Sequence, residues 1–422
     1  MSVLNLKKYK DESWDFREAD TKEYTHCFHT YPAMMIPQIA RKLIKEYGRE
    51  EGWLLDPYCG TGTSLVEASL FGMHSVGCDI NPLVRLIATA KSTPVCLSAL
   101  DETLSELNKY LFQVEYQESD LPDAPIPNIL NLTYWFSDEV IRTLAHLRAR
   151  ISHVRDKAIQ NFILVAFSET VREVSYTRNG EFKLYRMPTN KLKDFKPDVL
   201  GIFTKKLRRN QRGLASYLER RKNVKVSVSM VNTVQGELPT LHPPTGYDIV
   251  ITSPPYGDSQ TTVAYGQFSR LAAEWIGLPN ARKVDKLAMG GLRSKETLTN
   301  SPVSSAVEKI RSVDEKRAEE VSAFYIDLQR SINSIAQVCS PHATICYVVG
   351  NRRVKGVLLP TDEFVVDAFR QHGFLHKATI VRNIPNKRMP KKNSPSNIAG
   401  ETSKTMHEEN IVVCQRTSPI CE

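Results

Sequence analysis

A glycine-rich turn in the first quarter of the chain has the residue types of a ligand-binding loop. The apolar run Leu54–Asp56 precedes it and the helical pattern Ser64–Phe71 follows it. The turn reads Asp56-Pro57-Tyr58-Cys59-Gly60-Thr61-Gly62-Thr63. Gly60 and Gly62 allow positive φ and a close approach of the backbone to a ligand. Open α/β sheets bind ligands at such strand ends, where the next helix offers free N–H groups.

A second strand end supplies an acidic side chain about twenty residues further along. The apolar stretch His74–Ile80 contains Asp79 near its end, and Asn81-Pro82 follows. A carboxylate in this position can accept both hydrogen bonds from a ribose diol. The turn is neither G-x-G-x-x-G nor a P-loop, because no Gly-Lys-Ser/Thr follows it. The arrangement therefore predicts a ribose-containing cofactor that is not a dinucleotide.

A proline-rich loop follows the apolar strand Tyr247–Ser253 and reads Ser253-Pro254-Pro255-Tyr256-Gly257. Prolines fix φ and remove backbone donors, so the loop is stiff and its carbonyls are free to accept. An amino group on an aromatic ring is a poor nucleophile because its lone pair is delocalised. Ser253 and the Pro254 carbonyl can each accept one amino hydrogen, and Tyr256 offers a flat stacking face. The loop is suited to orienting such an amine.

The elements around these loops alternate between strands and helices, which predicts an α/β fold with a mainly parallel sheet. Seven strands are predicted, at Trp53–Asp56, His74–Ile80, Val224–Val231, Tyr247–Ser253, Ala343–Val349, Phe374–Arg382 and Asn410–Gln415. Helical patterns occur at Pro32–Tyr47, Ser64–Phe71, Pro82–Ala90, Phe324–Val338 and Thr361–His372.

Two long segments interrupt the alternation and divide the chain. Residues 1–94 carry the glycine turn, and residues 224–422 carry the proline loop. Between them, 95–223 is largely helical, with 3.6-residue periodicity at Leu97–Leu111, Asp138–Val154 and Ile159–Val174, and a basic loop at Tyr176–Pro197. A second insertion, 277–318, is rich in Lys, Arg, Ser and Gly and offers few predicted core positions. Segments of this length are usually functional or mobile.

Composition narrows the class of protein further. The 422 residues carry a net charge of +9, which suits a polyanionic partner. No apolar run is long enough to span a membrane, the N-terminus lacks a leader pattern, and we expect a cytoplasmic protein. The eight cysteines contain no C-x-x-C pair, so we expect reduced thiols and no metal site. The basic clusters are Lys205, Lys206, Arg208, Arg209 and Arg212; Arg220, Arg221 and Lys222; Arg352, Arg353 and Lys355; and Lys387, Arg388, Lys391 and Lys392.

These motifs resemble those of S-adenosylmethionine-dependent DNA methyltransferases that methylate exocyclic amino groups. The glycine turn resembles their motif I, and Thr252–Tyr256 resembles their motif IV. His29–Met34 resembles motif X, which packs over the methionine end of the cofactor. Gly77–Pro82 resembles motif II. Val234–Leu238 resembles motif III, with Glu237 where the family often has Asp. Later motifs that line the base pocket correspond to Val348–Asn351 and Asn386–Lys392.

The resemblance implies a Rossmann-like methyltransferase fold with a seven-stranded, mostly parallel sheet and S-adenosyl-L-methionine as cofactor. The implied cofactor-binding residues are Tyr31, Pro32, Asp56, Pro57, Gly60, Gly62, Thr63, Asp79, Ile80, Asn81 and Glu237. The implied catalytic residues are Ser253, Pro254, Pro255 and Tyr256. No metal ion belongs to this chemistry.

The serine that opens the proline loop is typical of the cytosine-N4 branch, whereas adenine-N6 enzymes usually carry Asp or Asn there. We therefore expect methyl transfer to N4 of cytosine in a specific sequence of double-stranded DNA, by base flipping. The enzyme would act alone or with a cognate restriction endonuclease. Adenine-N6 methylation stays open. The family's α-type order places target recognition between motifs III and IV, but here the long insertion lies between II and III. We favour 95–223 as the DNA-reading region, with 277–318 second.

Other functions fit the sequence less well. An RNA guanine-N2 methyltransferase commonly carries an RNA-binding domain before the cradle, and only about 50 residues precede it here. A protein glutamine methyltransferase usually begins its loop with Asn. An inactive DNA-binding module would not need both glycines and both prolines. Cytosine-C5 methylation requires a nucleophilic Cys, usually after Pro, and the chain has no Pro-Cys dipeptide; Glu409-Asn410-Ile411 resembles a C5 motif by chance and opens the last strand.

Overall fold

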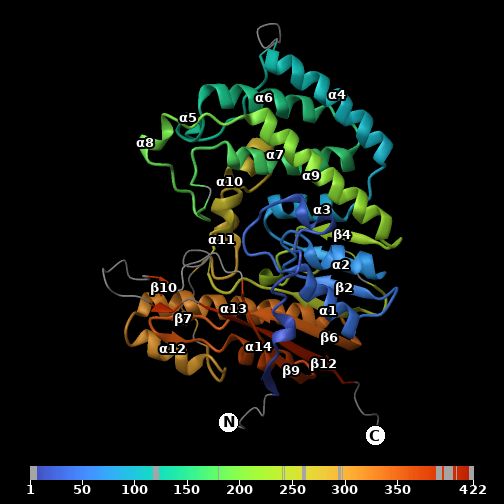
Figure 1. Ribbon diagram of the computed structural model, residues 1–422. Coiled ribbons are helices and arrows are strands. Elements are labelled where there is room, and N and C mark those ends of the chain that lie inside the picture. The colour runs from blue at the N-terminus through green and yellow to red at the C-terminus, as the bar shows by residue number, and fades with distance from the viewer. Residues whose placement is uncertain are drawn as a thin grey trace.

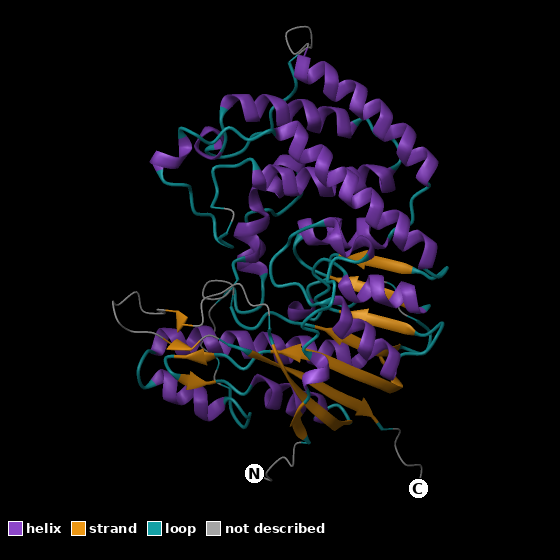
Figure 2. Ribbon diagram, in the orientation of Figure 1, coloured by secondary structure: helices purple, strands orange, loops and turns teal. Residues whose placement is uncertain are grey.

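An eight-stranded sheet forms the centre of the computed structural model, with a layer of helices beyond one of its edges (Figures 1 and 2). The structure describes residues 7–116, 123–178, 180–239, 241, 243–258, 263–292, 296, 298–385, 392–393, 403–404 and 406–417. The strands of the sheet are β1 (Lys8–Lys10), β2 (Trp53–Asp56), β3 (His74–Cys78), β4 (Val226–Ser229), β5 (Tyr247–Thr252), β6 (Cys339–Val349), β9 (Phe374–Asn383) and β12 (Glu408–Arg416).

The strand order is β1-β9-β12-β6-β5-β2-β3-β4. β6, β5, β2, β3 and β4 run parallel to one another, whereas β12 is antiparallel to both β6 and β9. Two small antiparallel pairs lie outside the sheet, and they consist of β7 (Arg353–Val354) with β8 (Val357–Leu358), and β10 (Lys392–Asn393) with β11 (Ser403–Lys404).

The helices divide between the two faces of the sheet and the helical insertion. The helices are α1 (Pro37–Tyr47), α2 (Thr63–Phe71), α3 (Pro82–Ser92), α4 (Leu97–Tyr116), α5 (Leu132–Trp135), α6 (Asp138–Ser152), α7 (Lys157–Glu173), α8 (Thr189–Leu192), α9 (Val199–Arg220), α10 (Tyr265–Ile276), α11 (Val284–Leu287), α12 (Ser304–Arg311), α13 (Glu315–Gln337) and α14 (Thr361–Arg370). Among the described residues, short 3-10 helices lie at η1 (Glu12–Trp14), η2 (Tyr24–Phe28) and η4 (Thr233–Gln235).

Apolar residues that alternate along the strands pack against helices on both faces of the sheet. In β2, Leu54 packs with α1 and α2 on one face, and Leu55 packs with α12, α13 and α14 on the other. Ile251 and Val250 of β5 divide between the faces in the same way. Because successive strand residues point to opposite faces, apolar runs in these strands require helices on both sides.

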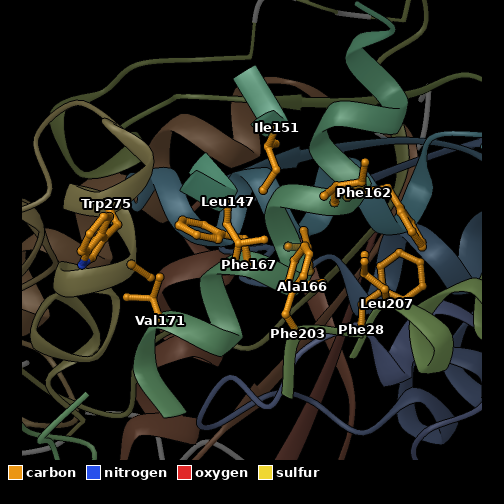
Figure 3. Close-up of a cluster of buried hydrophobic side chains, with 14 of the residues drawn as sticks. Phe28, Leu147, Ile151, Phe162, Ala166, Phe167, Val171, Phe203, Leu207 and Trp275 are labelled. Carbon is orange, nitrogen blue, oxygen red and sulfur yellow. The ribbon is translucent and has the colours of Figure 1, made fainter. Parts of the chain in front are cut away.

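The helical insertion has its own core, which it shares with segments from both halves of the chain (Figure 3). Phe162 and Phe167 of α7 lie at its centre. Phe28 of η2 meets Phe162 edge to face at 5.5 Å, and Trp275 of α10 meets Phe167 at 6.5 Å. Leu83 of α3 joins the same cluster. The insertion is therefore packed against the segments that precede the glycine turn and follow the proline loop.

The sequence predictions hold for all seven strands, and the expected mostly parallel α/β architecture is confirmed. The expected count of seven strands is wrong, because β1 adds an eighth strand parallel to β9 at the sheet edge. Its three residues, Lys-Tyr-Lys, are all exposed and show no apolar alternation, so their pairing left no pattern to detect.

The expectation of few core positions in 277–318 is also wrong. Val303, Val307 and Ile310 are buried against α13 and the sheet. Their spacing covers only about two helical turns, between polar and charged residues, which is too short for clear periodicity.

Three further observations concern membrane spans, metal sites and cysteines. No helix among the described residues is long and apolar enough to cross a membrane. Within the same part of the chain, no group of three or more His, Cys, Asp or Glu side chains is arranged to hold a metal ion. Seven of the eight cysteines lie in the described ranges, and all seven are free thiols.

Candidate active site

The glycine turn and the proline loop meet where β2 and β5 end side by side. The parallel register pairs Leu54 with Ile249 and Leu55 with Val250, which brings the two strand ends to one edge. The Thr252 hydroxyl donates to Asp56 Oδ1 at 2.6 Å. Loops far apart in sequence are thus joined directly.

Asp56 is committed to protein partners. Besides Thr252, its carboxylate accepts hydrogen bonds from the Ser64 hydroxyl and from the Tyr58 N–H, at 3.2 Å for the latter. Burial raises the pKa of Asp56 to about 6, although these three hydrogen bonds act to lower it. Because it accepts from both the glycine turn and the end of β5, Asp56 is a brace between the two loops.

Asp79 is placed to receive a ligand. Its Oδ2 accepts the Gly60 N–H at 3.1 Å and its Oδ1 accepts the Asn81 N–H at 2.8 Å. Each carboxylate oxygen has two lone pairs, so each keeps capacity for a further donor such as a ribose hydroxyl. Burial raises the pKa of Asp79 to about 6, partly offset by these backbone hydrogen bonds and by Arg85.

The two glycines of the turn serve different ends. Gly60 has φ +48°, and a Cβ there would meet no atom within 4 Å. Gly62 has φ +76°, and a Cβ there would lie 2.9 Å from Cβ of Ala88. Gly62 therefore permits close packing of the turn against α3, whereas Gly60 leaves open space beside the turn.

One cavity is lined by residues from both loops. The predicted site residues that line it are Tyr31, Pro32, Asp56, Pro57, Gly60, Thr63, Asp79, Ile80, Asn81, Ser253 and Pro255. Thr61 also lines it, and its buried hydroxyl has no hydrogen-bond partner among the described residues. Buried polar atoms are normally paired, so this hydroxyl and the spare lone pairs of Asp79 fit a polar, ribose-bearing ligand.

Tyrosines and a small polar network contribute another part of the cavity wall. Tyr31 stacks on Tyr265 of α10, with ring centroids 6.2 Å apart and an interplanar angle of 11°. Asn81 donates from Nδ2 to the Tyr31 hydroxyl at 3.0 Å and to the Ser269 hydroxyl at 2.7 Å. The segments that carry Tyr31, Asn81 and α10 are thereby fixed to one another.

The proline loop is held by a relay of hydrogen bonds that starts at its serine. The Ser253 hydroxyl donates to the Tyr256 hydroxyl at 3.3 Å, and Tyr256 donates to Glu409 Oε1 at 2.9 Å. Glu409 in turn accepts from Arg382 at 2.5 Å. Since the Ser253 hydroxyl donates its proton to Tyr256, the lone pairs of the Ser253 oxygen remain free to accept a hydrogen bond from another group. Gly350 lies against the Tyr256 ring, where a Cβ would come within 2.9 Å of Cδ2.

A buried ion cluster supports the loop from behind. Asp258 is 2% exposed and accepts from Arg317 and Arg352, each at 3.2 Å. At Gly257 a Cβ would lie 2.2 Å from Arg352, so only glycine allows this guanidinium so close to the backbone. Two charge-assisted contacts to one buried carboxylate make the end of the loop rigid.

Four predicted site residues lie outside the cavity lining. Gly62 packs on α3, and Pro254, which lies between the lining residues Ser253 and Pro255 in the sequence, is buried. Tyr256 sits in the relay described above. Glu237 is exposed and its carboxylate accepts the Asn232 N–H at 2.7 Å, so it braces the neighbouring wall. Of the loop Asn386–Lys392, residues 386–391 lie outside the described ranges. Lys387, Arg388 and Lys391 of the last basic cluster are among these undescribed residues.

Sequence reasoning missed several wall residues. Asn232, Thr233 and Val234 line the cavity beside Glu237, and Tyr265 lines it from α10. Val284, Leu287, Ala288 and Met289 close another side, around the short helix α11. The position of Tyr265 shortly after the proline loop could have indicated that it lies near the cavity. The α11 segment carried none, because its place depends on packing against distant elements.

Two basic residues of α9 form ion pairs inside the protein. Lys206 and Arg209 of α9 both pair with the buried Glu169, at 3.4 and 2.6 Å. Burial acts to raise the pKa of Glu169, but His29, Arg209 and Lys206 outweigh it and lower that pKa to about 2. Glu169 also accepts the Thr30 N–H at 3.1 Å. This part of the α9 cluster therefore holds the insertion to the segment that leads into the cavity.

The chain is similar to DNA methyltransferases in sequence. A family described as DNA methylase matches residues 4–89. The chain is similar to the Type II methyltransferase M.MvaI of Kocuria varians, with 40% identity over 94% of this chain and 92% of that one. It is 21% identical to the Type II methyltransferase M.BsoBI of Geobacillus stearothermophilus, over 82% and 77% of the two chains. A shorter match, 44% identical over 80 residues, reaches a tRNA (guanine(10)-N2)-dimethyltransferase of Methanocaldococcus jannaschii and covers 19% of this chain and 22% of that one.

Proposed function

Because this chain belongs to the amino-methylating (N4/N6) DNA methyltransferases of the Type II restriction–modification kind, we propose that it methylates N4 of cytosine in a specific duplex sequence. S-adenosyl-L-methionine is the cofactor of the family. The base choice, the site residues and a cognate endonuclease partner belong to the proposal. The observation that carries it is the shared cavity, in which Ser253 and Asp79 line the same space.

The cofactor end of the cavity would be formed by the glycine turn and by Asp79. The two carboxylate oxygens of Asp79 would accept the ribose hydroxyls, while Thr61 would supply a further polar contact. Tyr31 and Pro32 would cover the other side. When bound, the cofactor supplies an electrophilic methyl group on a sulfonium.

The proline loop would orient the cytosine amine. The Ser253 oxygen would accept one N4 hydrogen, because its own proton is directed to Tyr256. The Pro254 carbonyl would accept the other, and the N4 lone pair would then face the methyl group. Such a reaction needs orientation and a fixed set of acceptors, with no covalent enzyme intermediate. The flipped base would stack on Tyr256, whose ring is fixed by Glu409 and Gly350.

Serine at the head of the loop supports cytosine over adenine, since the adenine-N6 branch usually has Asp or Asn there. Nucleoside mass spectrometry of DNA treated with the enzyme and S-adenosylmethionine tests the choice. We expect N4-methylcytosine. Detection of N6-methyladenine without N4-methylcytosine would show that adenine is the target and would overturn the choice of cytosine.

A second candidate is guanine-N2 methylation of RNA, and the 80-residue match to the archaeal tRNA enzyme favours it. The same assay run on tRNA separates the two functions. N2-methylguanosine in tRNA, with no modified nucleoside in duplex DNA, would overturn the DNA proposal.

A further inference from the structure

A short hairpin projects from the helical insertion beside the candidate active site. It spans the described residues of 176–187, and Thr177 and Arg186 form its antiparallel bridge. The Arg178 N–H donates to the Tyr185 carbonyl at 2.8 Å, and the Met187 N–H donates to the Tyr176 carbonyl at 2.7 Å. In Figure 1 this green segment descends between α7 and α8, beside α10 and towards α11. We call it the 176–187 hairpin.

The hairpin is fixed close to the cavity wall. The Glu181 carbonyl accepts from Arg172 at 2.6 Å, and the Arg172 guanidinium lies 4.0 Å from the centre of the Phe268 ring. Phe268 meets Tyr31 edge to face at 5.2 Å, and Tyr31 lines the cavity. The Leu184 N–H also donates to Gln267 of α10 at 3.2 Å. Two side chains therefore separate the hairpin from the site.

Arg186 is held in a defined position on this hairpin. Its guanidinium lies 4.3 Å from the centre of the Tyr134 ring and 5.4 Å from that of Tyr176. Its Nε donates to the Tyr134 carbonyl at 2.8 Å. Within the described ranges the Arg186 guanidinium forms no ion pair and no hydrogen bond besides that of Nε, so both terminal nitrogens keep their donors for an external acceptor.

The surrounding cations follow the same pattern. Arg178, Lys191, Lys193 and Lys196 are exposed and form no ion pair within the part of the chain that the structure describes. This contrasts with α9, where Lys206 pairs with Glu169 and Glu173 and Arg209 pairs with Glu169. Phe195 packs against Tyr176 of the hairpin, with ring centroids 6.0 Å apart, so Lys193 and Lys196 lie close in the chain to a residue that contacts it. Unpaired cations around the hairpin produce a positive field there, which attracts a polyanion.

We propose that the 176–187 hairpin is an element that grips double-stranded DNA next to the base being methylated, with Arg186 as its main contact. The inference rests on the proposed function and specifies where that function reads its substrate. A planar guanidinium held between rings presents a fork that matches two acceptors, either phosphate oxygens or the O6 and N7 edge of guanine. Arg186 is a DNA-contacting residue in either case.

The matched experiment compares Arg186→Gln with Arg150→Gln in the full chain. Arg150 of α6 also lies over a tyrosine, 5.7 Å from Tyr110, but it is paired with Glu106 at 3.3 Å. Both variants lose one positive charge. Wild-type methylation data from randomised duplexes first give the target sequence, and DNA affinity is then measured across salt concentrations with the cofactor present.

We expect Arg186→Gln to weaken binding to the target duplex about five- to 150-fold and Arg150→Gln to leave it unchanged. A phosphate contact would lower the salt slope of log K by about 0.9 and keep the sequence preference. A guanine contact would relax the preference at one base pair. Equal affinities for Arg186→Gln, Arg150→Gln and the wild type would overturn the proposal. Arg186→Gln should keep wild-type affinity for S-adenosylmethionine, which reports folding.

A second measurement does not depend on the charge variant. A photo-reactive benzophenone amino acid replaces Tyr185 of the hairpin, or Tyr116 at the end of α4 as the control, and both tyrosines are exposed. We expect cross-links to the target duplex from position 185 only. Cross-links from 116 and none from 185 would also overturn the proposal. Failure of the proposed function is a separate outcome, since wild-type enzyme would then leave DNA unmethylated before any variant is made.

Discussion

The Thr252 hydroxyl and the Asp56 carboxylate meet at 2.6 Å, and this contact joins the cofactor loop to the proline loop. Both groups are buried, at 0% and 2% exposure. Asp56 receives further hydrogen bonds from Ser64 and Tyr58, so one carboxylate fixes the ends of β2 and β5 and the start of α2. The distance between methyl donor and acceptor would depend on this brace.

Replacing Thr252 by Val should weaken both folding and catalysis. The substitution keeps the shape of the side chain but leaves a buried carboxylate with one donor fewer, which costs about 1–3 kcal/mol of unfolding free energy. Urea unfolding and single-turnover methylation measure the two effects. Thr252→Ser is the control and should stay near wild type, because it keeps the hydroxyl. Equal behaviour of the Val and Ser variants would contradict the role of the hydrogen bond.

Cofactor affinity should depend on pH through Asp79. Burial raises the pKa of Asp79 to about 6, and only the ionised carboxylate can accept from both ribose hydroxyls. Affinity for S-adenosylmethionine should therefore be constant above about pH 7 and fall as pH decreases through 6. Isothermal titration from pH 5 to 8 measures it.

The Asp79→Asn variant is the control for that pH profile. It should bind the cofactor more weakly at every pH, with no inflection near pH 6. An inflection that persists in Asp79→Asn would assign the titration to another group. Asp56 is the first candidate, because burial also raises its pKa to about 6.

The Tyr256 ring and its hydroxyl should contribute separately. Tyr256→Ala removes the proposed stacking face and should abolish turnover while sparing cofactor binding. Tyr256→Phe keeps the face but loses the bond to Glu409, so we expect a rate loss of about tenfold. Methylation rates at saturating DNA distinguish the variants, and full activity of Tyr256→Ala would remove the stacking role.

The features that sequence reasoning could place are those with strong local signals. Apolar runs in β2 and β5 predicted two parallel strands, and the carboxyl ends of parallel strands share one edge of a sheet. That rule places Asp56 and Ser253 at the same edge of the sheet from the sequence alone, and both line the cavity. The insertion was recognisable as helical because α4, α6 and α7 are long and periodic.

Features that depend on long-range packing could not be placed. The wall residues Val284, Leu287, Ala288 and Met289 reach the cavity through the position of α11. Likewise, the pairing of Lys206 with Glu169 needs α7 and α9 to lie side by side, so the α9 cluster gave no sign of its internal role. The brace made by Glu237 depends on the local turn at Asn232.

The buried His29 should make the protein less stable in mild acid. Burial lowers the pKa of His29 to about 4, and neither ring nitrogen has a hydrogen-bond partner among the described residues. Between pH 6.5 and 4 the unfolded chain binds a proton that the folded chain does not, so stability falls as pH decreases through this window. At pH 5 the loss from His29 is about 2 kcal/mol relative to pH 7.5, at about 1.4 kcal/mol per pKa unit.

In His29→Leu this loss should be absent, and stability at pH 7.5 should lie within about 1 kcal/mol of wild type, since the substitution removes polar atoms that lack partners. Urea unfolding at pH 7.5 and pH 5 measures the difference. His26, whose pKa burial also lowers to about 4, stays in both proteins and accounts for a residual pH dependence in the variant. Identical losses in wild type and His29→Leu would show that His29 is protonated in the folded state at pH 5, with Glu169 as the neighbouring carboxylate that would stabilise the charge.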